Sequence, residues 1–319
     1  MASRKSPGKA HREGISLVQF CDMFPTEESA RKWFEKIVWP NGRTCPRCGC
    51  ADTRKASATS PLPYYCRGCQ KPFSVKIGTA LQKSNLPLRK WVFAIYLEMT
   101  NLKGVSSMKL HRDINVSQKS AWFMLHRIRE AWSGELEKAF EGSVEIDESM
   151  FGGRRANMSN AKRKELREAG MRQGPQGKTI AIGAKNREAG KVAARVVDSV
   201  DGETLPGFVD QVSEPDATVC TDEARGCKGM NRDRESVNHS VSEYVREMAH
   251  VNGIESFWSM LKRGYHGVYH HVSPKHLERY ICECAGRHKL READTLDQMR
   301  EVVARLVGKR VLYRELTEG

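Results

Sequence analysis

Long apolar runs are missing from this sequence of 319 residues. It contains no stretch of about eighteen apolar residues, so no membrane-spanning helix is expected. The basic segment at residues 1–12 is not followed by the uninterrupted apolar core of a secretory signal. Internal repeats and long low-complexity tracts are missing too. These absences predict a cytosolic protein, in which cysteines stay reduced and bind metal instead of pairing with each other.

Acidic residues are the minority among the charged ones. The chain has 53 Lys and Arg against 39 Asp and Glu, a formal net charge of +14 and an isoelectric point near 9.4. Neutralising phosphates releases condensed counterions, so this surplus favours a nucleic-acid partner, although a merely basic soluble protein would have the same charge. The length is enough for two or three domains of roughly 100–200 residues each.

Cysteine is plentiful, with 10 residues, and its spacing is informative. Cys45-Pro-Arg-Cys48 and Cys66-Arg-Gly-Cys69 are two Cys-x-x-Cys knuckles at the separation typical of a four-thiolate zinc site. We therefore predict a zinc ribbon with one structural Zn²⁺, surrounded by short strands. Cys50 could compete as a ligand, but the set is complete without it. A closed site leaves no position for chemistry, so the ribbon should serve to hold a basic surface rigid.

Helical patterns lie on both sides of the ribbon. A short helix is expected over 16–24, followed by a helix for which Thr26 is the predicted N-cap. The largely apolar segment 88–97 predicts a buried helix. Residues 104–129 predict a helix-turn-helix whose second helix starts at Ser117.

The second helix of this motif carries the candidate DNA contacts. They are Gln118 to Ser120 and His126 to Arg129, with Lys119 and Arg127 as the leading cations. Residues 130–140 would extend the helix as a spacer. A small helical bundle without DNA-binding function would show a similar periodicity.

Strand patterns begin after Gly142. The expected strands are 143–147, 178–184, 192–200 and 217–222, with a helix from about Gly202 before the last of them. Three strands, a helix, a strand and further helix is the order of an α/β ribonuclease-H-like fold. The first and fourth strands are neighbours in that order, so Asp147 and Asp222 would meet at adjacent positions of one sheet.

A third acid, Glu255, lies in a segment that predicts a helix crossing this sheet. Its apolar residues have helical spacing and include Trp258, which could pack in the core or stack on a flipped base. If Asp147, Asp222 and Glu255 converge, they make a carboxylate site for two Mg²⁺ or Mn²⁺ ions, suited to cutting and joining phosphodiester bonds. Residues 154–176, between the first two strands, read as a basic loop that either contacts DNA or is solvated.

From Cys45 to about Arg287 the sequence resembles the zinc-ribbon-bearing DDE transposases of bacterial insertion sequences, of the ISXO-like type. The motifs that carry the resemblance are Val144-Glu-Ile-Asp-Glu-Ser-Met-Phe-Gly-Gly, Thr221-Asp-Glu, His250-Val-Asn-Gly-Ile-Glu-Ser-Phe-Trp-Ser-Met-Leu-Lys-Arg-Gly and Tyr269-His-His-Val-Ser-Pro-Lys-His-Leu-Glu-Arg-Tyr. The resemblance implies a transposase that binds the ends of its element, cleaves them by metal-dependent hydrolysis and joins the 3′-OH ends to target DNA.

The resemblance also implies roles for single residues. Asp147 and Asp222 would be the first two metal ligands, and the third would be either Asn252 or Glu255. We prefer Glu255, because an anionic oxygen binds Mg²⁺ better than an amide oxygen does. Lys262 would touch DNA. Its neighbours on the same basic stretch add phosphate-binding candidates, Arg263 and Lys275.

The expected domain order is an N-terminal helical segment (1–40), the zinc ribbon (41–80), a helical DNA-binding region (81–141), a ribonuclease-H-like DDE catalytic domain (142–290) and a C-terminal helical tail (291–319). The expected partners are double-stranded DNA, both element ends and target, and a second copy in a homodimer or larger synaptic complex, with no membrane. A cytoplasmic, nucleoid-associated protein is expected. Two alternatives stay open: a non-catalytic zinc-ribbon regulator, and another ribonuclease-H-like nuclease that cuts without joining.

Overall fold

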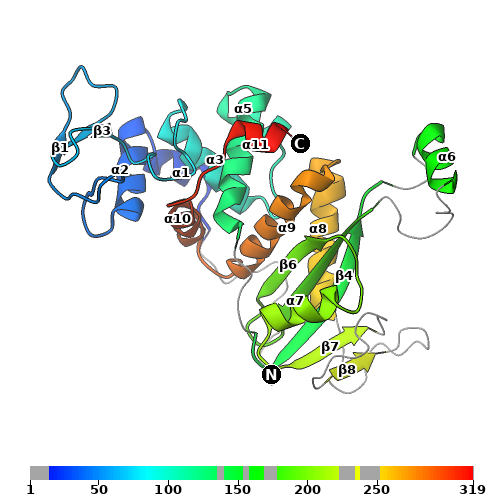
Figure 1. Cartoon of the computed structure of the whole chain (residues 1–319). Coiled ribbons are helices and arrows are strands. Elements are labelled where there is room, and N and C mark those ends of the chain that lie inside the picture. Colours follow the sequence, from blue (N-terminus) through cyan, green and yellow to red (C-terminus); the bar gives the residue numbers. More distant parts are fainter. Residues whose placement is uncertain are drawn as a thin grey trace. The chain divides into compact units, whose positions relative to one another are not determined.

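The computed structural model describes residues 14–134, 140–153, 158–168, 178–222, 234–237 and 252–318. The chain forms two compact units (Figure 1). A helical unit comprises residues 1–133, 266–270 and 290–319, and it includes the cysteine knuckles. An α/β unit comprises residues 134–265 and 271–289.

The helical unit is built from short helices with a small three-stranded sheet inserted between two of them. Its helices are α1 (Leu17–Met23), α2 (Glu27–Val38), α3 (Leu88–Thr100), α4 (Ser107–Ile114), α5 (Gln118–Arg129), α10 (Thr295–Arg305) and α11 (Tyr313–Thr317). Its strands are β1 (Thr53–Lys55), β2 (Tyr64–Cys66) and β3 (Pro72–Phe73), all paired antiparallel. The helices predicted from the patterns at 16–24, after Thr26, at 88–97 and at 104–129 are confirmed.

Side-chain caps explain where several of these helices begin. Thr26 accepts a hydrogen bond from the backbone N–H of Ser29 at 3.2 Å, which confirms the predicted N-cap of α2. The Glu27 carboxylate accepts hydrogen bonds from the backbone N–H groups of Leu88 and Arg89, at 2.7 and 2.9 Å. A single acid therefore joins the start of α2 to the start of α3 and compensates the dipole of α3.

The predicted helical spacer over 130–140 is wrong. After α5 the chain makes one 3₁₀ turn, Glu130–Trp132, and turns extended at Ser133. Gly134 follows with a φ of +81°, a left-handed conformation that stops helix propagation. Residues 135–139 lie outside the described part of the chain.

The α/β unit is organised around one five-stranded sheet. Its strands are β4 (Ser143–Phe151), β5 (Thr179–Asn186), β6 (Val192–Val197), β7 (Thr218–Asp222) and β8 (Arg234–Val237). The order across the sheet is β6-β5-β4-β7-β8, with β5 antiparallel and β7 parallel to the central β4. The predicted adjacency of the first and fourth strands is therefore confirmed, whereas the fifth strand was not predicted.

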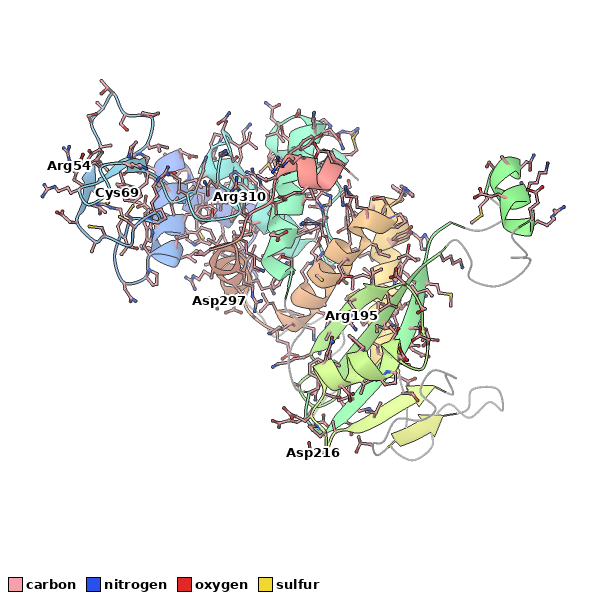
Figure 2. The ribbon with its side chains drawn as sticks, in the orientation of Figure 1. Arg54, Cys69, Arg195, Asp216, Asp297 and Arg310 are labelled. Atoms are coloured by element: carbon pink, nitrogen blue, oxygen red, sulfur yellow. The ribbon has the colours of Figure 1, made fainter. Side chains whose placement is uncertain are left out.

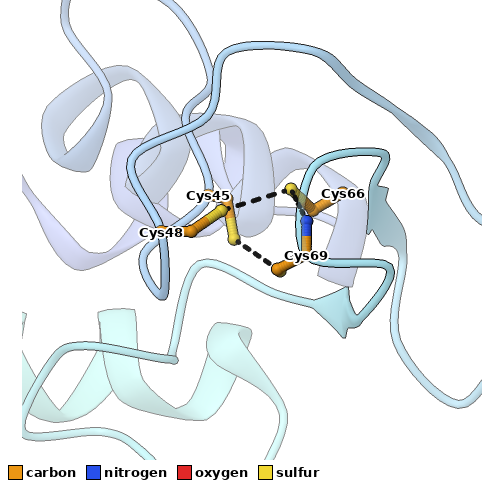
Figure 3. Close-up of side chains that lie close together, drawn as sticks. All are labelled: Cys45, Cys48, Cys66 and Cys69. Carbon is orange, nitrogen blue, oxygen red and sulfur yellow. Dashed lines mark hydrogen bonds between the residues drawn. The ribbon is translucent and has the colours of Figure 1, made fainter.

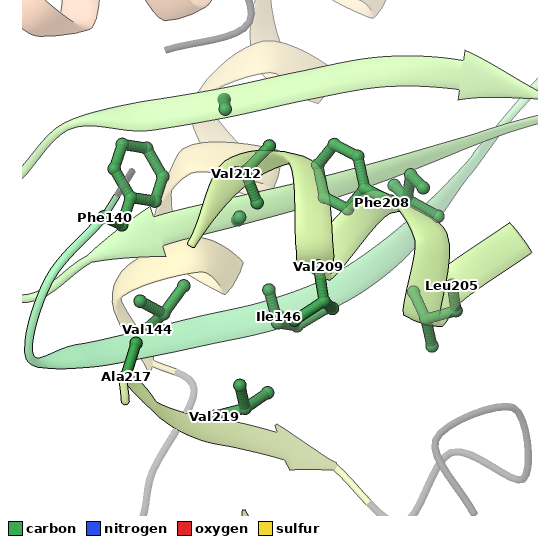
Figure 4. Close-up of a cluster of buried hydrophobic side chains, with 12 residues drawn as sticks. Phe140, Val144, Ile146, Leu205, Phe208, Val209, Val212, Ala217 and Val219 are labelled. Atoms are coloured by element: carbon green, nitrogen blue, oxygen red, sulfur yellow. The ribbon is translucent and has the colours of Figure 1, made fainter. Parts of the chain in front are cut away.

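Helix α7 (Thr204–Val212) covers one face of this sheet. Val144 and Ile146 of β4 point to this face and pack with Phe208 and Val209 of the helix, all of them buried (Figure 4). Side chains of a strand alternate between faces, so Glu145 and Asp147 belong to the opposite face. The apolar side of β4 thereby fixes which of its acids can share a site.

Helix α8 (Asn252–Gly264) packs on the opposite face, against β4 and β5. Gly183 of β5 is paired with Asp147 and lies beneath the Trp258 ring. A Cβ atom at Gly183 would meet Trp258 Cζ2 at 2.6 Å and Ile254 Cδ1 at 3.2 Å. Trp258 is 3% exposed and its ring contacts Phe151 at a centroid distance of 6.1 Å, so it packs in the core and does not stack on a base.

The edge of the sheet at β6 is covered by helix α9 (Pro274–Lys289). Glu278 of α9 accepts a hydrogen bond from the backbone N–H of Val196 at 2.5 Å. Burial raises the pKa of the Glu278 carboxyl, although this hydrogen bond acts in the opposite direction. An acid from α9 thus occupies one outward-facing donor of the edge strand.

The segment 154–176 is not a loop throughout. Its described part contains helix α6 (Asn160–Glu168), in which Lys164 and Glu168 form an exposed i,i+4 ion pair at 3.8 Å. This run is composed mainly of good helix formers, a propensity that its basic charge obscured. Of the described helices, none combines the length and apolarity that crossing a bilayer would require.

Gly183→Ala should destabilise the α/β unit, because a new methyl group would have to displace the buried Trp258 ring. We expect its free energy of unfolding to fall by about 1–3 kcal/mol. Gly207→Ala is the matched control: Gly207 lies within α7 with no atom near its Cβ position, so the same change should raise stability by about 0.5–1 kcal/mol. Urea unfolding of both variants measures the effect, and equal shifts would contradict the packing argument.

Candidate functional site

Four cysteine sulfurs converge in the ribbon (Figure 3). The Sγ atoms of Cys45, Cys48, Cys66 and Cys69 all lie within 4.8 Å of one another, with 3.7 Å between Cys45 and Cys69 and 3.6 Å between Cys48 and Cys66. Thiolates bound tetrahedrally at about 2.3 Å from a zinc ion are about 3.8 Å apart, whereas a disulfide needs about 2.05 Å. The geometry therefore suits one structural Zn²⁺. Cys50 is not part of this cluster.

The two knuckles have the same backbone design. The N–H of Cys45 donates to the carbonyl of Cys50 at 2.9 Å, and the N–H of Cys66 donates to that of Lys71 at 3.1 Å. Each knuckle ends on a left-handed residue, Gly49 with φ +72° and Gln70 with φ +54°. The N–H of Cys69 also donates to the Cys66 sulfur, which lowers the pKa of that thiol to about 7, whereas burial raises the pKa of the Cys69 thiol.

A small aromatic core supports the knuckles. Tyr64 and Phe73 are buried beside Cys45 and Cys66, and Trp39, which follows α2, packs on both rings at centroid distances of 5.9 Å. The Tyr64 hydroxyl donates to Glu35 of α2 at 2.6 Å; its pKa is raised, first by burial and then by that carboxylate. Because these contacts are few, a metal is needed to hold so small a module together.

Cations cover the outside of the ribbon. The Arg43 guanidinium lies 4.0 Å from the Tyr64 ring centroid, and Arg54 lies 5.0 Å from that of Tyr65 (Figure 2). Arg43 also donates from Nε to Thr53 Oγ1 at 2.9 Å. Guanidinium groups held on aromatic rings are preorganised for phosphate, so the ribbon presents a surface suited to a polyanion.

Asp147, in the middle of β4, and Asp222, the last residue of β7, occupy adjacent positions on two parallel strands. In the β4–β7 ladder Glu145 is paired with Cys220 and Ile146 with Thr221, so the next positions are Asp147 and Asp222. Asp147 is half-buried, and its Oδ1 accepts a hydrogen bond from the backbone N–H of Glu148 at 2.8 Å. The side chain of Asp222 lies outside the described side chains, although its backbone belongs to β7.

Glu255 and Asn252 both lie in the first turn of α8, which packs beside Asp147, and both are exposed. At about 100° of rotation per residue, Glu255 lies about 60° around the helix from the sheet-facing Trp258, whereas Asn252 lies about 120° from it. Glu255 is therefore the one nearer to the sheet. Lys262, two turns further on, falls about 20° from Glu255 on the same exposed side.

The two sets of candidate ligands, carboxylate oxygens and cysteine thiolates, suit different metal ions. Carboxylate oxygens from Asp147 and Glu255 suit a hard divalent cation such as Mg²⁺ or Mn²⁺, while the four thiolates suit zinc. Among the side chains that the structure describes, the cysteine set is the one cluster close enough to hold a metal. The acidic candidates include Asp222, whose side chain is not among the described ones.

The helix-turn-helix candidates are only partly accessible. Lys119 is exposed, with its Nζ 4.8 Å from the Tyr313 ring of α11. Arg127 is only 6% exposed and its guanidinium lies 4.3 Å from the Phe123 ring. His126 and Arg129 are fully buried as well. The expectation that His126 to Arg129 face DNA is wrong, because the carboxyl half of α5 lies inside the helical unit.

The basic candidates after Glu255 are accessible. Lys262, Arg263 and Lys275 are all exposed. Arg263 donates to the Ser259 carbonyl at 3.3 Å and to its hydroxyl at 3.1 Å, so its side chain lies along α8. These residues remain candidates for phosphate contacts.

Two features near the acids were not predicted: the packing of the Trp258 ring on Gly183, and the buried carboxylate of Glu145. The Glu-x-Asp spacing in Val144-Glu-Ile-Asp could have indicated the second, because residues two positions apart on a strand face the same side of the sheet.

The chain matches two known domain families and one protein of a transposable element. Residues 139–288 match the ISXO2-like transposase domain family, and residues 25–72 match the transposase zinc-ribbon domain family. The chain is also 27% identical over 250 residues to an uncharacterized protein in the transposable element ISH50 of Halobacterium salinarum, an alignment that covers 75% of this chain and 83% of the relative. The zinc-ribbon match begins before the knuckles and includes helix α2, which agrees with the Tyr64–Glu35 contact.

Cys66→Ser should release the zinc ion, because it removes one of four ligands. We expect the purified variant to contain less than one zinc per chain by elemental analysis, with loss of the near-ultraviolet circular dichroism of Trp39 and Tyr64. Cys50→Ser is the matched control and should keep its zinc, since Cys50 lies outside the sulfur cluster. Zinc loss in Cys50→Ser, or full zinc content in Cys66→Ser, would contradict the ligand assignment.

Proposed function

Because this chain joins a transposase zinc ribbon to an ISXO2-like transposase domain, it belongs with the zinc-ribbon ISXO2-like transposases, and we propose that it cuts and joins DNA at the ends of an insertion sequence. The observation that carries the proposal is the parallel pairing of β4 with β7, which brings the Asp147 and Asp222 positions together. The strand order β6-β5-β4-β7-β8, with one antiparallel strand beside the centre, supports a ribonuclease-H-like fold.

Asp147, Asp222 and Glu255 are the proposed ligands of the catalytic metal. A pair of bound Mg²⁺ ions would activate the attacking oxygen and stabilise the leaving oxygen of the phosphodiester. Glu255 is preferred over Asn252 because it carries a charge and lies nearer to the sheet around α8. Asn252 would then stand outside the ligand set, on the side of the helix turned away from the sheet.

Two successive displacements at phosphorus account for the reaction. In the first, a water oxygen bonds to phosphorus at the element end, the bond to the 3′ oxygen breaks, and that oxygen leaves as a 3′-hydroxyl. In the second, this hydroxyl attacks a target phosphodiester in line, and the target's own 3′ oxygen leaves. Lys262, on the same side of α8 as Glu255, would hold a backbone phosphate near the acids, with Arg263 and Lys275 extending this contact.

DNA is proposed to be held by both units. The ribbon offers Arg43 and Arg54 on aromatic rings, and α5 offers Lys119 from its exposed amino end. Arg127 is not included, because its guanidinium is buried. Joining requires two element ends at once, so a homodimer or larger complex bound to paired ends, in the cytoplasm, is part of the proposal.

Asp147→Asn should lower metal-dependent nicking of end-containing DNA by at least about 10²–10³-fold, the effect of removing one preorganised charged group from a reacting centre. The exposed Asp216, in the loop before β7, provides the matched control (Figure 2). Asp216→Asn should leave the rate unchanged. A zinc-ribbon regulator without catalysis would show no nicking in the wild type, and this result would refute the proposal.

The wild type should also join a pre-cleaved 3′-OH end to a target plasmid in Mg²⁺ or Mn²⁺, a product that gel electrophoresis resolves. Nicking without any joined product would indicate another nuclease of the same fold.

Glu255→Gln should reduce nicking far more than Asn252→Ala does, since the first removes a metal-binding charge and the second an amide on the outer side of α8. Single-turnover rates at several Mn²⁺ concentrations compare the two. The reverse ranking would make Asn252 the third ligand.

A further inference from the structure

Glu145 is a buried acid at the centre of the sheet. It is 1% exposed, lies two residues before Asp147 on β4 and is paired directly with Lys185 of β5. A carboxylate removed from water costs free energy unless charges and hydrogen-bond donors surround it. Its position on the face that carries α8 gives it access to such groups.

The partners of Glu145 come from the turn after β5 and from the start of α8. Oε1 accepts a hydrogen bond from Arg187 Nε at 3.0 Å, and the Arg187 side chain is itself only 13% exposed. Oε2 accepts from the backbone N–H of Ile254 at 2.8 Å, across 109 residues of sequence. Ile254 is the third residue of α8, so Glu145 satisfies one of the donors that a helix leaves open at its amino end.

The start of α8 is held from a second side. Lys185 donates from Nζ to the carbonyl of Gly253 at 3.1 Å. A Cβ atom at Gly253 would lie 2.6 Å from Glu145 Oε2 and 3.0 Å from Lys185 Nζ. The helix backbone therefore sits directly on the Glu145–Lys185 pair, with no room for a side chain between them.

We propose that Glu145 is a positioning residue for the metal site, an inference that rests on the proposed function. It joins the strand that carries Asp147 to the turn that carries Glu255, through one hydrogen bond to the residue before Glu255. Asp147 is about 7 Å further along the same strand face. Glu145 thus fixes the spacing of two proposed ligands while its own oxygens are engaged by Arg187 and Ile254.

Glu145→Gln tests this role, because it replaces one of the two acceptor oxygens with an NH2 donor, so that either Arg187 or Ile254 faces a donor instead of an acceptor. Gly253→Ala tests it from the helix side and leaves Glu145 chemically intact. The matched control is Glu283→Gln: Glu283 pairs with Arg287 at 3.0 Å, with exposed side-chain fractions of 2% and 14%, almost the same as the 2% and 13% of the Glu145–Arg187 pair. Glu283 lies on α9 of the same unit and is not one of the groups that hold the Ile254 N–H and the Gly253 carbonyl.

The readouts are Mn²⁺ binding to the zinc-loaded full chain by titration calorimetry, and the Tm of each variant. Glu145→Gln and Gly253→Ala should raise the Kd for Mn²⁺ about 10–100-fold, the usual cost of losing a group that orients a ligand. Glu283→Gln should lower Tm to a similar degree with an unchanged Kd. Equal Kd increases in the Glu145 and Glu283 variants, or none in either test variant, would overturn the inference.

Failure of the proposed function would look different. In that case the Kd of Asp147→Asn for Mn²⁺ would equal that of the wild type, whatever Kd the Glu145 variant shows. If Glu145→Gln does not fold, the Kd of Gly253→Ala decides the inference alone.

Discussion

The parallel pairing of β4 with β7 is the constraint on which the candidate active site depends. The parallel register puts Asp147, in the middle of β4, beside the position of Asp222, at the end of β7, although the two acids are distant in sequence. β4 can take this central position because both of its faces are covered. Val144 and Ile146 pack beneath α7, and the opposite face receives α8. Asp147 lies on this second face, in the middle of β4.

The cysteine cluster and the proposed carboxylate site use different sources of order. In the ribbon the four thiolates come from two short, nearly identical turns, and metal binding and local folding are one event. In the α/β unit the sheet and α8 are held by apolar packing, as the Trp258 ring on Gly183 illustrates. The proposed carboxylate site would therefore be shaped by apolar packing before a metal ion binds. Its carboxylates would not be needed to stabilise the fold, so their arrangement could serve catalysis.

Much of this arrangement was predictable from local patterns. The knuckle spacing identified the zinc site, and the alternation around Asp147 and Asp222 predicted their adjacency through the strand order. Local sequence patterns did not predict the burial of a residue where an element distant in sequence covers its side chain. Arg127 is on a helix that begins where it was predicted, but the periodicity of the sequence does not reveal which other elements cover the Arg127 side chain. The strand β8, Arg-Glu-Ser-Val, has no apolar alternation, because an edge strand can be polar. The role of Glu145 could be inferred only from the structure, in which its carboxylate accepts a hydrogen bond from the backbone N–H of Ile254.

The carboxylate of Glu278 on the edge strand β6 has a consequence for assembly. An edge with open backbone groups can recruit a strand from a second molecule and extend the sheet across the contact. Here α9 lies against that edge and Glu278 accepts the hydrogen bond of the Val196 N–H, so continuation of the sheet into a neighbouring subunit is blocked near the carboxyl end of β6. In the proposed complex on paired DNA ends, the copies would therefore not extend this sheet through its β6 edge.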